Sequence, residues 1–90
     1  MEAKAEHATE VRQLAETKLL PVTRAYEGCE SATMHVNEDD PGGLLFVQRW
    51  RTRGHYERYI AWRRGTGDLA PLAELLERPL SVRYFDDVDV

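Results

Sequence analysis

The sequence predicts an α+β fold in which helices cover one face of an antiparallel sheet. Three observations lead to it: a helical period of apolar residues over 8–26, two neighbouring β-like runs joined by turn residues, and two shorter helical patterns before a last β-like run. The order of elements is therefore helix, strand, strand, helix, short helix, strand. This order is typical of a two-layer α+β sandwich.

Composition limits the class of protein. A chain of 90 residues fills one core, so we expect a single domain over 1–90, with the acidic residues 86–90 as a frayed tail. Twelve Lys and Arg against sixteen Asp and Glu argue against a nucleic-acid or membrane partner. The lone Cys29 excludes an internal disulfide, and the start of the chain lacks the apolar centre of a signal peptide. We expect a cytoplasmic protein.

The first helix is predicted from apolar residues that recur every three or four positions. Val11, Ala15, Leu19, Val22 and Tyr26 fall on one face, which indicates an amphipathic helix of about 18 to 20 residues. Pro21 lies inside it and predicts a kink, because proline lacks the amide donor. Gly28 is predicted to cap the helix end.

A hairpin follows. Apolar and polar residues alternate over 29–38, turn-forming residues fill 37–43, and residues 44–50 are again β-like. In the second strand one face should meet the helices and the other a dimer partner, because successive side chains point to opposite sides. The first face holds Leu44, Phe46, Gln48 and Trp50, and the second holds Leu45, Val47 and Arg49.

The second half of the chain predicts two helices and a strand. Thr52 is placed to cap a helix that runs to about Arg64 and is interrupted by residues 65–67. Asp68 is placed to cap a short helix with leucines on one face, and Pro79 closes it. Residues 80–85 then alternate as a strand does.

Several of these pieces together resemble the antibiotic biosynthesis monooxygenase family. The resemblance implies a ferredoxin-like fold, the dimeric α+β barrel, and covers nearly the whole chain. Two departures stand out: the usual first strand is replaced by a charged, helix-prone start, and Tyr59 stands where many relatives carry a histidine. The resemblance rests on Glu27-Gly28-Cys29, Asp39-Asp40-Pro41-Gly42, Phe46-Val47-Gln48-Arg49-Trp50, residues 59–64, Thr66-Gly67 and residues 79–86.

The resemblance also implies a substrate site. In members that oxidise polycyclic anthrones without a cofactor, a tryptophan and a tyrosine at this spacing line the cavity, and the matching positions are Trp50 and Tyr56. An indole N–H and a phenol O–H are suited to orient a phenolic oxygen in an apolar pocket. Those members place an asparagine where this chain has Phe46. The alternative is that Trp50 and Tyr56 only pack the helix onto the sheet.

Other candidates surround this pair. Gln48 shares a strand face with Trp50 and is expected either in the cavity or hydrogen-bonded to backbone. Six arginines lie between residues 49 and 64, and Arg63 or Arg64 is expected at the mouth of the cavity. The alternative is that these arginines form a solvated helix face paired with acidic residues elsewhere. His35 is a candidate base, or a residue of an open sheet face. The histidines show no metal-ligand spacing, so no metal site is expected.

The function implied by the resemblance is a cofactor-independent monooxygenase that uses dioxygen on a polycyclic phenol, anthrone or quinol. The substrate supplies the electrons, so no cofactor is expected, and the protein would be a homodimer. The alternative is a non-catalytic dimeric ligand-binding or accessory protein of the same fold. RNA binding through the arginines and tyrosines is disfavoured by the overall acidity.

Overall fold

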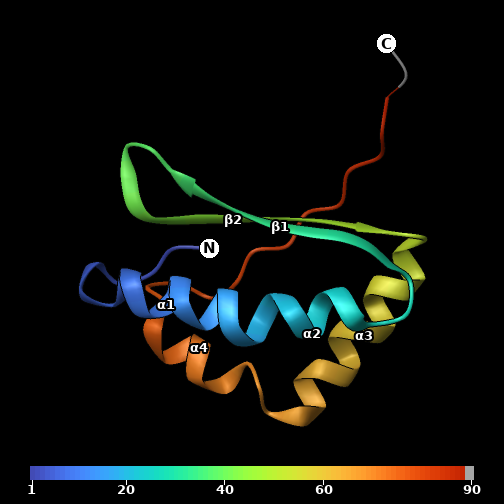
Figure 1. The fold of residues 1–90 in the computed structure, drawn as a ribbon, viewed down its shortest axis with the longest axis horizontal. Helices are drawn as coiled ribbons and strands as arrows, with labels where there is room; N and C mark the ends of the chain where they lie inside the picture. Colours follow the sequence, from blue (N-terminus) through green and yellow to red (C-terminus); the bar gives the residue numbers. More distant parts are fainter. Residues whose placement is uncertain (89–90) are drawn as a thin grey trace.

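The structure, a computed structural model that describes residues 1–88, has two layers (Figure 1). An antiparallel hairpin forms one layer, and the helices lie together on one side of it, which confirms the predicted α+β fold. Residues 89–90 of the expected acidic tail lie outside the described residues. The elements are η1 (Ala5–His7), α1 (Ala8–Leu14), η2 (Ala15–Leu19), α2 (Leu20–Ala25), β1 (Cys29–Asn37), β2 (Asp40–Trp50), α3 (Arg53–Thr66) and α4 (Ala70–Leu75).

The first helix is continuous from α1 to α2, but it contains a π-helical turn, η2, just before Pro21. Proline has no N–H to donate back along the helix, and a wider turn is one way for a helix to absorb that loss. The Leu19 carbonyl at the end of this turn accepts hydrogen bonds from two side chains. Thr23 Oγ1 and Arg63 Nη1 each donate to it at 2.9 Å.

The sequence predicted that Gly28 caps this helix, and this prediction is wrong. The helix already ends at Ala25, and Tyr26 is extended. Gly28 instead forms a tight turn, with a φ of 91° that glycine adopts without strain. The turn is closed by the Cys29 N–H, which donates to the Tyr26 carbonyl at 3.1 Å. A Cβ at Gly28 would also collide with the ring of His55.

The predicted hairpin is confirmed, with a tighter turn than expected. Only Glu38 and Asp39 separate the strands, and residues 40–43 belong to β2. Asp39 N–H donates to Asn37 Oδ1 at 2.9 Å, which stabilises the turn. In the register Met34 lies opposite Phe46, so the apolar faces of both strands coincide and point to the helices.

The start of the chain partly fills the place of the missing strand. No strand is assigned before β1 within residues 1–88, but the chain runs extended beside β2. Leu44 N–H donates to the Met1 carbonyl at 2.7 Å, and Ala3 N–H donates to the Gly42 carbonyl at 2.8 Å. On the other side of this segment, the Glu2 carbonyl accepts a hydrogen bond from Glu77 N–H at 2.9 Å. The segment therefore joins β2 to the chain just after α4.

The core lies between the hairpin and the first helix. Val11 and Ala15 are completely buried, and Leu72 of α4 closes the core from the far side. Phe46 packs against this core as a half-buried side chain. The core cluster consists of Ala3, Val11, Ala15, Leu19, Leu44, Leu72 and Leu76.

The two later helices largely match the sequence. Thr52 caps α3 as predicted, its side chain accepting from His55 N–H at 3.2 Å, and Gly67 ends the helix with a φ of 78°. The predicted cap at Asp68 is wrong: α4 begins one residue later, its N-cap position is Leu69, and no side chain caps it. None of the helices in residues 1–88 is long and apolar enough to span a bilayer.

Residues 80–85 were predicted as a strand, and this prediction is wrong. They carry no regular secondary structure, and Leu80, Val82 and Tyr84 stay 42%, 48% and 45% exposed. A strand needs a sheet edge for its backbone hydrogen bonds, whatever its side-chain pattern, and this stretch pairs with none of the described strands. After α4 the chain passes the level of the sheet, and its last described residues lie on the side away from the helices (Figure 1).

Candidate functional site

Aromatic side chains gather where β2 ends and α3 folds back against α2. Trp50 ends β2, and its ring centroid lies 5.8 Å from that of Tyr56 and 5.0 Å from that of Tyr59, both on α3. Trp50 and Tyr56, which the resemblance to the family paired, are therefore in contact. We call the connected set of rings the aromatic cluster; it contains Tyr26, Trp50, Tyr56, Tyr59, Trp62 and Tyr84.

The indole N–H of Trp50 already has a partner inside the site. Nε1 donates to Gln48 Oε1 at 2.9 Å, and the two side chains share the helix-facing side of β2. Gln48 therefore lies beside Trp50, as the alternation predicted, and its carbonyl bonds a side chain rather than backbone. The bond fixes the plane of the indole and leaves the amide NH₂ of Gln48 free to donate.

Tyr59 and Arg63 form a buried polar centre under the cluster. Tyr59 is 4% exposed, and its hydroxyl lies 2.7 Å from Thr23 Oγ1. Arg63 is 1% exposed and donates from Nη1 to Tyr59 Oη at 2.8 Å and to Thr23 Oγ1 at 3.2 Å. Arg63 thus lies inside the protein. The prediction that Arg63 lies at the mouth of a substrate cavity is wrong.

The charge of Arg63 is not balanced by a carboxylate among residues 1–88. Its bonds go to a carbonyl and two hydroxyls, and its buried Nε has no hydrogen-bond partner. A buried cation without a counter-ion is costly and creates a positive potential in its surroundings. The guanidinium carbon lies 5.8 Å from the centroid of the Tyr59 ring, so this potential reaches the cluster.

Tyr56 is the half-buried phenol of the cluster. Burial raises the pKa of Tyr56, and the neighbouring Tyr84 and Tyr59 raise it further, while Arg64 acts against them. The phenol is therefore protonated throughout the neutral range and available as a hydrogen-bond donor.

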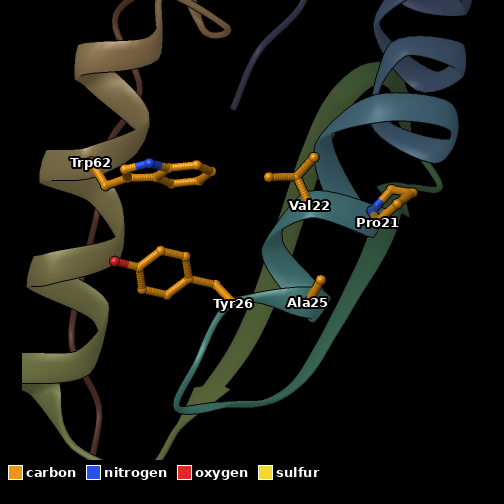
Figure 2. Close-up of a pocket in the computed structure, with 5 residues that line it drawn as sticks. All are labelled: Pro21, Val22, Ala25, Tyr26 and Trp62. Carbon is orange, nitrogen blue, oxygen red and sulfur yellow. The ribbon is translucent and has the colours of Figure 1, made fainter.

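An apolar groove adjoins the cluster on the outer side of the helices. It has a volume of about 330 Å³ and lies between α2 and α3. Figure 2 shows the indole of Trp62 reaching from α3 towards Val22, with the ring of Tyr26 below it. Tyr26 belongs to both features, because its ring centroid lies 5.2 Å from that of Trp62 and 5.3 Å from that of Tyr59. The groove is lined by Pro21, Val22, Ala25, Tyr26 and Trp62.

With this geometry established, comparison with known proteins places the chain. The model of the antibiotic biosynthesis monooxygenase family matches residues 1–63, which include Trp50, Tyr56, Tyr59 and Arg63. The chain belongs to the antibiotic biosynthesis monooxygenase family. None of the curated proteins is similar enough to count as a match.

Two solved structures show the same fold as this family member. Rv0793 from Mycobacterium tuberculosis is 23% identical with a TM-score of 0.77, over 98% of this chain and 91% of its own. A candidate antibiotic biosynthesis monooxygenase from Deinococcus radiodurans is 23% identical with a TM-score of 0.71, over 94% of this chain and 92% of its own. The ferredoxin-like fold expected from the resemblance is thereby confirmed.

Two residues expected at the family site lie elsewhere. His35 is on the opposite, open face of the sheet, where its Nε2 lies 3.0 Å from Thr33 Oγ1. Phe46 faces the helices but packs into the main core rather than the aromatic cluster. Among residues 1–88 no group of three His, Cys, Asp or Glu side chains is placed to hold a metal ion.

Cys29 lies at the start of β1, outside the cluster. Burial raises the pKa of the Cys29 thiol, while a backbone hydrogen bond at Ser31 and the charge of Arg24 act against this rise. A thiol with a raised pKa carries little thiolate at neutral pH and is a poor nucleophile.

Sequence reasoning did not assign three members of the aromatic cluster to a site. The spacing in the first helix predicts Tyr26 only as part of its apolar face, and Trp62 has no assigned role in the helix that follows Thr52. Tyr84 was placed in a strand. A usable signal existed for Tyr59 and Trp62, because a separation of three residues puts them on the same side of α3. Tyr84 lies far along the chain, so no local pattern connects it to Tyr56.

Proposed function

We propose that the protein binds a planar aromatic molecule at the aromatic cluster and oxidises a phenol, anthrone or quinol of this kind with dioxygen, without a cofactor. The observation that carries this proposal is the buried guanidinium of Arg63, which has no carboxylate partner among residues 1–88 and lies beside the ring of Tyr59, which in turn contacts Trp50. Loss of a proton turns such a substrate into an electron-rich anion. A fixed positive charge in a site shielded from water favours that anion.

The reaction balances without a further reductant. An anthrone methylene loses its proton, the carbanion gives its electrons to dioxygen, one oxygen atom becomes the new carbonyl and the other leaves as water. The protein's task is then to bind, orient and stabilise the anion. The phenol of Tyr56 is suited to donate to a substrate oxygen, and Gln48 holds the indole of Trp50 in a defined plane.

Ring contacts within the cluster also support aromatic binding. Edge-to-face and tilted pairs at 5.0–6.3 Å are the geometries that aromatic rings prefer, so an aromatic substrate can replace one such contact by another. The groove beside Trp62 extends this surface at the outer end of the cluster.

A homodimer is part of the proposal. The face of the sheet away from the helices carries Leu45 and Val47, which are 54% and 42% exposed beside Thr33 and His35. An antiparallel sheet with apolar residues on its open face is usually covered, and a second copy can offer the same face in return. Sedimentation at micromolar concentration is expected to give about twice the 10.4 kDa of one chain. A stable monomer contradicts this part.

The second candidate is a dimeric ligand-binding or accessory protein without turnover. It is favoured by the packed state of the cluster and by the Trp50 indole donor, which is already bound to Gln48. It shares the same site and ligand class. The two candidates therefore differ in dioxygen consumption and not in binding.

The test follows dioxygen uptake by chelator-treated protein given an anthrone or a quinol. We expect uptake above the buffer rate, and loss of that excess when Trp50→Phe and Tyr56→Phe are combined. Arg63→Met is expected to slow uptake strongly, whereas the exposed Arg58→Gln on the same helix is the matched control and should not. Binding seen as a change in tryptophan emission without any uptake selects the second candidate. Neither binding nor uptake across the panel refutes both.

A further inference from the structure

The C-terminal residues 80–88 touch the site although they have no secondary structure. Arg49 at the end of β2 donates from Nη1 to both carboxylate oxygens of Asp87, at 2.8 and 3.1 Å. Further back along the segment, the guanidinium carbon of Arg53 lies 3.6 Å from the centroid of the Tyr84 ring. The segment is therefore fastened at two points near the junction of β2 and α3.

Tyr84 makes direct contact with the proposed site. Its ring centroid lies 5.8 Å from that of Tyr56, with the planes at 77°, so the two rings meet edge to face. Tyr56 in turn contacts Trp50. Tyr84 is thus the outermost ring at this end of the cluster, with Arg53 packed on its face.

The fastening is weak by its chemistry. Both partners of the Arg49–Asp87 pair are largely exposed, and exposed ion pairs add little stability and are screened by salt. Among residues 1–88, the backbone hydrogen bonds that join separate elements end at Glu77, before this segment begins. A stretch held by so few contacts opens far more readily than the core.

We propose that residues 80–88 form a detachable wall of the aromatic site, in which Tyr84 holds the ring of Tyr56 in place and the Arg49–Asp87 pair is the latch. When the latch is closed, Tyr84 covers Tyr56 from water. When it opens, the Tyr56 end of the cluster is exposed and a substrate can enter. The role of the wall in substrate entry rests on the proposed function, but its opening does not.

The latch is tested by trypsin cleavage after Arg83 in the full chain under native conditions. Asp87→Asn is expected to speed cleavage about two- to fivefold, the range that an exposed ion pair supports. The adjacent Asp86→Asn is the matched control and should leave the rate unchanged. Raising the salt concentration should speed cleavage of the wild type and not of Asp87→Asn. Equal rates for the two variants would overturn the latch.

The role of Tyr84 is tested by the titration of Tyr56, followed by NMR of protein labelled at the tyrosine Cζ carbons and assigned with Tyr56→Phe. Tyr84→Ala should lower the pKa of Tyr56 towards its ordinary value, because the cover is lost. Tyr84→Phe keeps the ring and should retain most of the raised pKa. If the pKa of Tyr56 is unchanged in Tyr84→Ala, Tyr84 does not hold Tyr56 in place.

These outcomes stand apart from catalysis. Neither measurement uses a substrate, so a protein that consumes no dioxygen refutes the proposed oxidation and leaves the wall intact. Conversely, active protein with equal cleavage rates refutes the wall alone. Protection of Arg83 that increases with protein concentration also overturns the wall, because it would place residues 80–88 against a second copy.

Discussion

Arg63 donates a hydrogen bond of 2.8 Å to the hydroxyl of Tyr59, one helical turn before it on α3, and both side chains are buried. Through Thr23 and the Leu19 carbonyl the same pair ties α3 to the first helix. The π-helical turn before Pro21 leads into this contact. The polar centre thus joins the two helices and supplies charge to the aromatic cluster.

Arg63→Ala is expected to lower the free energy of unfolding by about 2 to 5 kcal/mol, because it leaves a cavity and removes the hydrogen bonds from Arg63 to the Leu19 carbonyl and to the hydroxyls of Thr23 and Tyr59. Urea denaturation measures this. Arg63→Met fills the space without charge and should recover much of the stability. If Arg63→Met also keeps full affinity for an anionic phenolate probe, the electrostatic role is wrong.

Tyr59→Phe should cost about 1 to 2 kcal/mol, because it removes a buried hydroxyl bonded to Thr23 and Arg63. Tyr26→Phe is the control, since among residues 1–88 its hydroxyl makes no hydrogen bond to protein. Combining Tyr59→Phe with Thr23→Val should cost less than the sum of the single changes, because they break a shared bond. Additive losses would show that the hydroxyls do not act together.

Gly28→Ala should destabilise the protein by about 1 to 3 kcal/mol, for two separable reasons: the positive φ and the collision with His55. Adding His55→Ala to this variant removes the collision only. The double variant should therefore lose less stability than the sum of the two single variants, measured by thermal or urea unfolding. Gly65→Ala, where a Cβ meets open space, is the control and should not destabilise.

The latch should depend on pH in the acid range. The hydrogen bond from Arg49 lowers the pKa of Asp87, and the attraction between their charges lowers it further. The stabilisation is therefore complete above the ordinary aspartate pKa and is lost as the pH falls through the lowered pKa. Carboxyl-carbon NMR should show Asp87 titrating below the ordinary aspartate range. In Arg49→Gln this lowering should disappear.

Val47→Lys is expected to weaken the proposed dimer, because two copies would bring like charges together in an apolar interface. Sedimentation should then show a monomer at concentrations where the wild type is dimeric. Ala61→Lys, an exposed change on α3, is the control for added charge. An unchanged dimer in Val47→Lys would move the interface away from the open face of the sheet.

Local periodicity was sufficient for the elements that place the site. Alternation over 29–50 predicted the hairpin and the face shared by Gln48 and Trp50, and Thr52 predicted where α3 begins. A short connection between strand and helix then brings Trp50 and Tyr56 together. These features depend on neighbours in the sequence, which is why the sequence shows them.

Features that depend on distant partners were not predictable. Arg63 lies in an arginine-rich stretch typical of a solvated face, and its burial depends on acceptors that α2 and η2 bring from about forty residues away. Residues 80–85 have the pattern of a strand, but the pattern does not say whether a free edge is within reach. The extended start of the chain looked helical because its charged residues have no strand pattern.

Both tryptophans of the chain, Trp50 and Trp62, lie in the aromatic cluster and contact the same side chain, Tyr26. The intrinsic emission of the protein therefore comes entirely from this region, with the surrounding tyrosines close enough to pass excitation energy to the indoles. The intrinsic tryptophan fluorescence of the native chain therefore reports on the aromatic cluster. A ligand, a change of salt or an altered neighbour in the cluster can be followed without attaching a dye.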